Sequence, residues 1–190
     1  MFKTLLDRIA MIVSIVSENY SMLEVQFTIG ETNISTLLVA TTVDGIREIL
    51  LSDNSAAATL DLQRRFPSSE RNDNDTELNS ILSDLIDLVN DPLHVKNLGL
   101  DLNLDLRGSP FQIRVWQALR KIPAGTTVSY QEISTRISAP RSARAVAGAC
   151  AANPIAVVIP CHRVVRSDGT LSGYRWGIAR KRALLQREQR

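Results

Sequence analysis

The chain has 190 residues, of which 44% are hydrophobic and 22% are charged. This length suits one domain or two small ones, and the composition excludes a disordered chain, a collagen and a coiled coil. Two cysteines, Cys150 and Cys161, cannot supply the disulfide framework of a small secreted protein, so a reducing, cytoplasmic setting is expected. No apolar stretch reaches the roughly 20 residues that a membrane span requires, so no membrane partner is expected.

The charge is divided unequally along the chain. Residues 1–106 hold 7 Lys and Arg against 17 Asp and Glu, whereas residues 107–190 hold 15 against 3. A strongly basic second half predicts contact with a polyanion such as a nucleic acid. A solvated basic surface without a partner is the alternative reading of the charge alone. We expect 1–106 to be a scaffold domain and 107–190 to be the domain that carries the chemistry.

The first half predicts an α/β domain with a small antiparallel sheet. Alternating and helical spacings of apolar residues predict strands or helices, in chain order, at 22–29, 34–41, 46–51, 56–66, 78–89 and 98–106. Of these, the segments 56–66 and 78–89 are the helices. Asp44-Gly45 predicts a hairpin between the second and third strands. The polar segment 71–75 is expected to be a mobile loop.

The second half predicts mainly helices. Ser109-Pro110 is typical of a helix start, because serine caps and proline suits the first turn. Helices at 130–137 and 141–152, joined by a tight turn, outline a helix-turn-helix. The second of them consists mostly of alanine, glycine and serine, so its backbone can approach another surface closely or pack tightly in a core; the pattern leaves both open. A buried extended segment at 155–159 and a final helix at 177–189 follow.

Chemistry is indicated where the buried segment ends, at Pro160-Cys161-His162-Arg163-Val164. Cysteine is a nucleophile as its thiolate, and a nearby base promotes that form. Adjacent residues point in different directions, so His162 is expected to reach the thiol through a bridging water. The natural group to orient His162 is a carboxylate on the final helix, where Glu188 is the acidic residue. A small buried hydrophobe is the alternative reading of Cys161.

The second half resembles the catalytic domain of the O6-methylguanine-DNA methyltransferase family, and in particular the alkyltransferase half of the bacterial Ada proteins. The resemblance covers about 80 residues in unbroken register, and the Pro-Cys-His-Arg-Val core is highly specific to this family. The matching motifs are Val128-Ser129-Tyr130-Gln131, Arg141-Ser142-Ala143-Arg144-Ala145-Val146, Asn153-Pro154, Ile159-Pro160-Cys161-His162-Arg163-Val164 and Leu171-Ser172-Gly173-Tyr174-Arg175-Trp176-Gly177.

The resemblance implies a ribonuclease-H-like α/β N-terminal domain and a mainly α C-terminal domain with a winged-helix-like helix-turn-helix. It implies DNA repair by irreversible transfer of a methyl group from O6-alkylguanine, and from O4-methylthymine, in double-stranded DNA to Cys161. One protein molecule is then consumed per transfer, no cofactor or metal is expected, and the chain is expected to be a monomer. The alternatives are a non-catalytic protein that binds alkylguanine lesions and a helix-turn-helix transcription factor with a redox cysteine.

The resemblance also implies catalytic roles for individual residues. Cys161 accepts the alkyl group, His162 is the water-mediated base, and Glu188 orients that base. Asn153 holds the turn between the recognition helix and the active-site segment.

Further roles implied by the resemblance concern DNA and the flipped base. Tyr130 helps to rotate the nucleotide and hydrogen-bonds the guanine ring, and Arg144 fills the base stack. Ser142 and Ala143 approach the DNA beside Arg144. An enzyme that acts on a base inside a duplex must first extrude it, which these roles would accomplish.

The pocket itself is implied to be closed by the loop 172–176. Gly173 and Tyr174 cover the base, and the backbone of Arg175 lies near the alkylated oxygen. Backbone carbonyls at Cys161 and Val164 accept hydrogen bonds from the guanine amino group.

Overall fold

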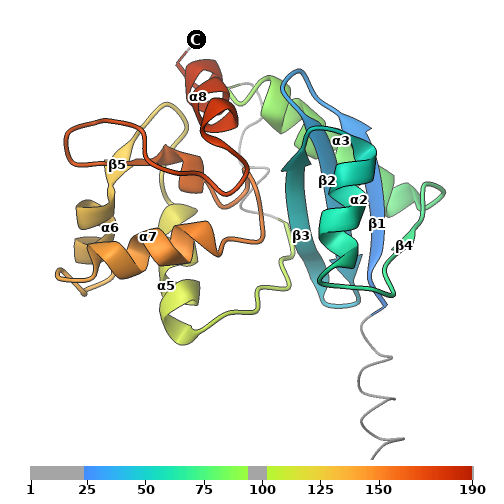
Figure 1. Ribbon diagram of the computed structural model, residues 1–190, viewed down its shortest axis with the longest axis horizontal. Helices are drawn as coiled ribbons and strands as arrows, with labels where there is room; N and C mark the ends of the chain where they lie inside the picture. The colour runs from blue at the N-terminus through green and yellow to red at the C-terminus, as the bar shows by residue number, and fades with distance from the viewer. Residues whose placement is uncertain (1–23, 94–101, 190) are drawn as a thin grey trace, which may run out of the picture.

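The computed structural model describes residues 24–93 and 102–189. Its first half is built on a four-stranded sheet of order β3-β2-β1-β4 (Figure 1). The strands are β1 (Gln26–Glu31), β2 (Thr36–Thr42), β3 (Gly45–Ser52) and β4 (Glu70–Arg71). The pairs β1–β2 and β2–β3 are antiparallel, whereas β4 runs parallel to β1. The sheet is therefore mixed, and not the antiparallel sheet predicted from the sequence.

Helices α2 (Ser55–Gln63) and α3 (Thr76–Asn90) cover the two faces of this sheet. Side chains alternate along β2, so that Leu38 and Ala40 pack with the α2 cluster while Leu37 and Val39 pack with the α3 cluster. Because both faces are covered, residues 37–40 of β2 are apolar without alternation. Both helices lie where the sequence predicted them.

Two further predictions for the first half differ from the structure. Of the loop predicted at 71–75, Arg71 belongs to β4 and the Asn72 amide donates to the Phe27 carbonyl, so only residues 72–75 lie between β4 and α3; their mobility stays a prediction. Of the strand predicted at 98–106, residues 98–101 lie outside the described residues. The described remainder makes a single bridge, from Leu104 to Ile46, so the leucine alternation marks a half-buried connection.

The second half contains helices, two short parallel strands and a 3-10 turn. They are α5 (Pro110–Leu119), β5 (Val128–Ser129), α6 (Tyr130–Arg136), α7 (Ala143–Ala151), η1 (Cys161–Arg163), β6 (Val164–Val165) and α8 (Ile178–Arg187). Reciprocal side-chain and backbone hydrogen bonds cap α5 at Ser109 and α6 at Ser129. The helices α5, α6 and α7 pack on one another, and α7 begins two residues later than predicted.

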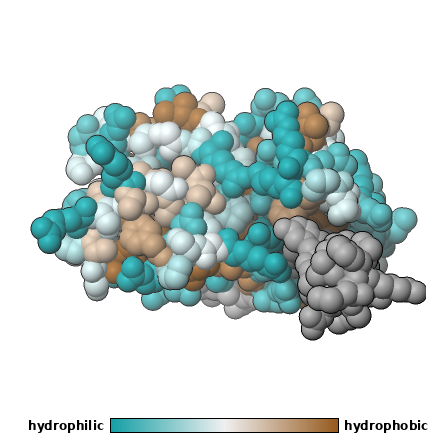
Figure 2. Space-filling model, turned by 60° about the horizontal axis from the view of Figure 1, so that its bottom comes forward, coloured by the Kyte–Doolittle hydropathy of each residue, from teal (hydrophilic) through white to brown (hydrophobic). Residues whose placement is uncertain are grey.

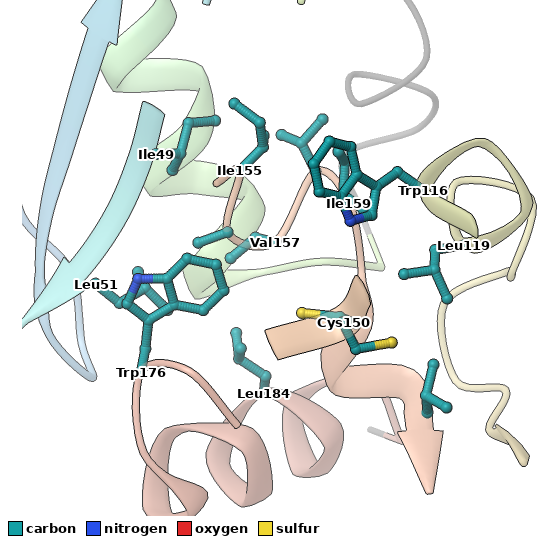
Figure 3. Close-up of a cluster of buried hydrophobic side chains, with 14 of the residues drawn as sticks. Ile49, Leu51, Trp116, Leu119, Cys150, Ile155, Val157, Ile159, Trp176 and Leu184 are labelled. Atoms are coloured by element: carbon teal, nitrogen blue, oxygen red, sulfur yellow. The ribbon is translucent and has the colours of Figure 1, made fainter. Parts of the chain in front are cut away.

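One hydrophobic core joins the two halves (Figure 3). Ile49 and Leu51 of β3 meet Ile155 and Val157 of the segment after α7, and Trp116 of α5 lies in the same cluster. The segment 155–159 is fully buried, as predicted, but it is a series of turns and not an extended strand. Val157 has a φ of 65°, which is unusual for a β-branched residue. The division into domains at 106–107 remains a prediction.

The surface is mixed in character. On the face in Figure 2, hydrophilic residues predominate and the hydrophobic ones form separate patches. Within 24–93 and 102–189, no helix has the length and apolarity that crossing a membrane would need.

Candidate active site

The side-chain amide of Asn153 holds the Cys161 thiol. Both residues are buried, and Asn153 Nδ2 lies 3.2 Å from Cys161 Sγ. The same nitrogen donates to the Ile155 carbonyl at 3.0 Å and to the Ile159 carbonyl at 2.9 Å, while Oδ1 accepts from the Ile155 amide. One side chain therefore fixes the turns that lead to the thiol and the thiol itself.

Burial raises the pKa of the Cys161 thiol above its ordinary value. The hydrogen bond from Asn153 and the positive charge of Lys181 lower that pKa in part. Burial raises the pKa of Cys150 more than that of Cys161, because the charge of Lys181 is the one influence that lowers the pKa of Cys150. The protonated thiol is thus the stable form in the dry pocket, and its reaction as a thiolate requires a proton acceptor.

His162 and Glu188 supply such an acceptor. Glu188, at the end of α8, accepts from His162 Nε2 at 2.9 Å, which is the pairing predicted from the sequence. Burial lowers the pKa of His162, so the imidazole is neutral at pH 7. Because a carboxylate can only accept, Nε2 carries the proton and Nδ1 is a bare acceptor. That buried Nδ1 has no hydrogen-bond partner within the described part of the chain.

Arg163 keeps Glu188 ionised. Its Nε lies 3.0 and 3.1 Å from the two carboxylate oxygens, its Nη2 lies 2.8 Å from Oε1, and its Nη1 donates to the Ile122 carbonyl. Burial alone would raise the pKa of Glu188, but the hydrogen bond from His162 and the hydrogen bonds and charge of Arg163 lower it to about 2. Since the imidazole is neutral, Arg163 is the permanent cation of this group.

Lys181 of α8 is a fully buried cation whose charge lowers the pKa of the Cys161 thiol. Its Nζ donates to the Val164 carbonyl at 2.5 Å and to Ser172 Oγ at 3.5 Å. No carboxylate in 24–93 or 102–189 forms an ion pair with it. Burial lowers the pKa of Lys181, and the nearby Cys161 counteracts this effect. The ammonium is therefore placed to favour a negative charge on sulfur.

A cavity of about 510 Å³ opens next to the thiol. Its lining comes from α6, α7, the Cys161 turn, the residue after β6 and the loop 172–176: Tyr130, Ala147, Cys150, Ala151, Cys161, Arg166, Ser172, Gly173, Tyr174 and Arg175. The Tyr130 hydroxyl lies 2.6 Å from Ser172 Oγ, which links α6 to the loop. The buried Tyr174 hydroxyl has no partner within the described ranges. The same ranges contain no group of three or more His, Cys, Asp and Glu suited to a metal ion.

The structure places the remaining predicted residues outside this cavity. Arg144 is exposed near the start of α7, and Ala143 and the capping residue Ser142 are half-buried. Ser142 Oγ donates to the Ala139 carbonyl and does not cap the helix. The Val164 carbonyl, implied to bind a guanine amino group, already accepts from Lys181. A carbonyl has a second lone pair for another donor.

Sequence reasoning missed the roles of Lys181 and Arg163. Lys181, Leu184 and Glu188 are spaced i, i+3 and i+7, so they share one face of α8, and that face is buried. Two charged residues on the apolar side of a helix are a signal that could have pointed to the thiol and the imidazole. Arg163 gives no such signal, because its partner lies 25 residues away.

Comparisons with known proteins agree with this geometry. The family model described as "6-O-methylguanine DNA methyltransferase, DNA binding domain" matches residues 110–190. The bifunctional transcriptional activator/DNA repair enzyme Ada of Escherichia coli (strain K12) is 46% identical over 166 residues, which are 87% of this chain and 46% of that protein. The methylated-DNA–protein-cysteine methyltransferase of Mycobacterium bovis is 57% identical over 89 residues, which are 47% of this chain and 54% of that protein.

A solved structure matches most of both chains. Mycobacterium tuberculosis OGT in complex with DNA has a TM-score of 0.68 and 34% identity, covering 86% of this chain and 92% of that one. The chain belongs to the O6-methylguanine-DNA methyltransferase family. Its matches span about half the length of the curated relatives. The fold is that of the family, with a small mixed sheet joined to a helical half.

We predict that Glu188→Gln lowers the free energy of unfolding at pH 7 by about 3 kcal/mol, because Arg163 loses a buried counter-ion. Since the folded-state pKa is about 2 and the ordinary value is 4.5, the contribution of the carboxylate is complete above pH 4.5. It is lost as the pH falls toward 2, so wild type and variant should converge there. Urea unfolding between pH 2 and pH 7 measures this.

The control is Glu70→Gln, which changes an exposed carboxylate on β4 and should leave the unfolding midpoint unchanged. A Glu188→Gln midpoint equal to that of the wild type at pH 7 would contradict the ionised pair.

Proposed function

We propose that this protein repairs DNA by moving a methyl group from O6-methylguanine in a duplex to Cys161. The observation that carries the proposal is the placement of the Cys161 thiol. It lies in a cavity between Tyr130 and the loop 172–176, and the His162–Glu188 pair stands behind it. The cavity can hold a single nucleobase. Its thiol, the proton-accepting His162 and the orienting Glu188 carboxylate form a nucleophilic site. Family membership supports the same reaction.

We propose that α7 enters the minor groove. That groove is about 6 Å wide in B-DNA, and small side chains such as Ala145 and Gly148 on the exposed side of α7 suit a close approach. A Cβ added at Gly148 would meet open space, so this surface is free for contact. The exposed Arg144 guanidinium would stack in the gap that the extruded nucleotide leaves. Basic residues of the second half would contact phosphates without reading sequence.

The chemical step is a single displacement. The sulfur–carbon bond forms while the bond between the methyl carbon and O6 breaks, and the electron pair returns to guanine. The thiol proton passes through a bridging water to the bare Nδ1 of His162. Guanine N1 takes up one proton from water as the methyl group leaves, and His162 returns its proton to water, so that the protons balance. Lys181 and Asn153 stabilise the negative charge on sulfur during proton loss. The Tyr130 hydroxyl and the Val164 carbonyl hydrogen-bond the guanine.

The product is a thioether, which has no acidic proton and no good leaving group. Water therefore cannot release the alkyl group, and each protein molecule reacts once. A protein that only binds alkylguanine would need no nucleophile, so the presence of Cys161 with its proton acceptor favours transfer over lesion binding. O4-methylthymine presents the same kind of methylated oxygen and is included in the proposal.

We further propose a ribonuclease-H-like arrangement for 1–106 and a winged-helix-like helix-turn-helix for 107–190. The α6–turn–α7 order and the α/β layers of the first half support this reading. The protein is proposed to act as a cytoplasmic monomer on double-stranded DNA, with no membrane partner. Its two free cysteines are consistent with a reducing compartment. Sedimentation at micromolar concentration, with and without duplex, tests the monomer.

We expect a duplex containing labelled O6-methylguanine to transfer one equivalent of label to Cys161, because this thiol alone has the proton acceptor. Intact-mass and peptide mapping measure both the amount and the position. Cys161→Ala should abolish transfer and retain duplex binding. The matched control is Cys150→Ala, which removes the other buried thiol of the same cavity and should retain transfer. Label on any other side chain, or more than one equivalent, would refute the proposal.

We expect Arg144→Ala to slow transfer from duplex DNA by about tenfold or more. Without the guanidinium, the gap in the base stack stays unfilled, which raises the free energy of the state with the extruded nucleotide by about 1.4 kcal/mol or more. Transfer from free O6-alkylguanine base should stay at the wild-type rate, since no flipping is needed. Rapid-quench kinetics with both substrates give the comparison. Arg182→Ala, which removes an exposed arginine of α8, serves as the charge control. An equal loss with the free base would assign Arg144 to the pocket instead of the stack.

A further inference from the structure

The hydroxyl of Ser172 lies between two side chains of the active site. Ser172 begins the loop that covers the cavity, and its Oγ lies 2.6 Å from the Tyr130 hydroxyl of α6. On its other side, the Lys181 ammonium of α8 donates to the same Oγ at 3.5 Å. Within the described ranges, these two contacts are the hydrogen bonds of the Ser172 side chain. One hydroxyl therefore joins a buried cation to the tyrosine that the proposed function places against the base.

Hydrogen-bonding chemistry limits how these three groups can be ordered. An ammonium has hydrogens and no lone pair, so Lys181 is the donor to Ser172. Its positive charge turns the oxygen of the Ser172 hydroxyl toward it and the hydrogen away. Tyr130 Oη, at 2.6 Å, is then the acceptor for that hydrogen, which leaves the hydrogen of the Tyr130 hydroxyl free for another group. In the opposite order, Tyr130 would spend its hydrogen on Ser172.

A guanine in the cavity favours the first of these orders. The ring of O6-methylguanine presents bare nitrogens, which accept hydrogen bonds. When Ser172 donates to Tyr130 and Tyr130 donates to the ring, each hydroxyl hydrogen has an acceptor. The opposite order leaves the Ser172 hydrogen and a ring nitrogen unpaired, which is costly where water is excluded. Bound guanine therefore completes a chain of donors that runs from Lys181 through Ser172 and Tyr130 to the base.

The charge of Lys181 gives this chain its effect on the reaction. Lys181 is fully buried, and no carboxylate in 24–93 or 102–189 forms an ion pair with it. Its charge is thus felt by the two groups to which it donates, the Val164 carbonyl and Ser172. The bond to Ser172 is long, but the attraction of a full charge falls slowly with distance where the dielectric is low. Successive hydrogen bonds polarise one another, so the lysine strengthens the Tyr130 hydroxyl as a donor.

We propose that Ser172 is a positioning residue for alkyl transfer: its hydroxyl accepts from Lys181 and donates to Tyr130, so that Tyr130 directs its own hydrogen at the guanine. Negative charge passes to guanine as the methyl carbon leaves, so a strengthened donor there stabilises the transition state more than the bound substrate. The inference rests on the proposed function, because it concerns the same reaction. Ser172 acts through Tyr130.

The experiment measures single-turnover transfer from an O6-methylguanine duplex over a range of DNA concentrations. We expect Ser172→Ala to lower the rate constant at saturation about tenfold, and to leave the half-saturating concentration and the amplitude unchanged. Ser172→Thr keeps the hydroxyl and should restore the rate constant to within about threefold of wild type. A bond that only held the loop in place would act on binding, so its loss would raise the half-saturating concentration instead.

A double-mutant cycle shows whether Ser172 acts through Tyr130. We expect Ser172→Ala combined with Tyr130→Phe to react no more slowly than Tyr130→Phe alone, since no phenol hydroxyl is left to direct. The matched control is Thr135→Ala, which removes an exposed hydroxyl from the same helix as Tyr130. That hydroxyl donates to the Gln131 carbonyl and lies outside the cavity lining, so this variant should transfer at the wild-type rate.

Four results would overturn the inference: a wild-type rate constant for Ser172→Ala, a loss confined to the half-saturating concentration, losses that multiply in the double variant, or an equal loss for Thr135→Ala. These are distinguishable from failure of the proposed function. In that case the wild-type protein itself would show no transfer to Cys161.

Discussion

A single buried amide, the side chain of Asn153, is the constraint on which the site depends. It satisfies two backbone carbonyls and the acceptor sulfur from one nitrogen, in a place where water does not compete. An unpaired polar group there would be costly, so the turn has few other conformations available. The positive φ of Val157 can persist because the surrounding hydrogen bonds determine the backbone around it.

The side chains that line the cavity come from the second half of the chain, but both halves share one hydrophobic core. β3 uses one face of its side chains for that core and its open edge for hydrogen bonds to the turn that follows Asn153, so the sheet has little unpaired edge on that side. α8 contributes a buried lysine and a buried glutamate on one face. The thiol is therefore enclosed by elements that are far apart in the sequence.

Local signals in the sequence were sufficient to predict the helices, because capping residues and the spacing of apolar residues depend on near neighbours in the chain. They also predicted the pairing of His162 with Glu188, which the structure contains, whereas the catalytic roles of Cys161, His162 and Glu188 stay predictions. The parallel β4, the single bridge at Leu104 and the turns at 155–159 could not be predicted, because partners elsewhere in the fold determine them.

The most direct test of this account is the single-turnover rate constant of Asn153→Asp with an O6-methylguanine duplex. The change keeps the shape of the side chain but replaces the donating nitrogen with an acceptor, which removes the hydrogen bond to sulfur. The account predicts a rate constant lower by about a hundredfold among the molecules that fold, close to the value of a hydrogen bond to a charged group. A rate constant equal to that of the wild type would contradict it.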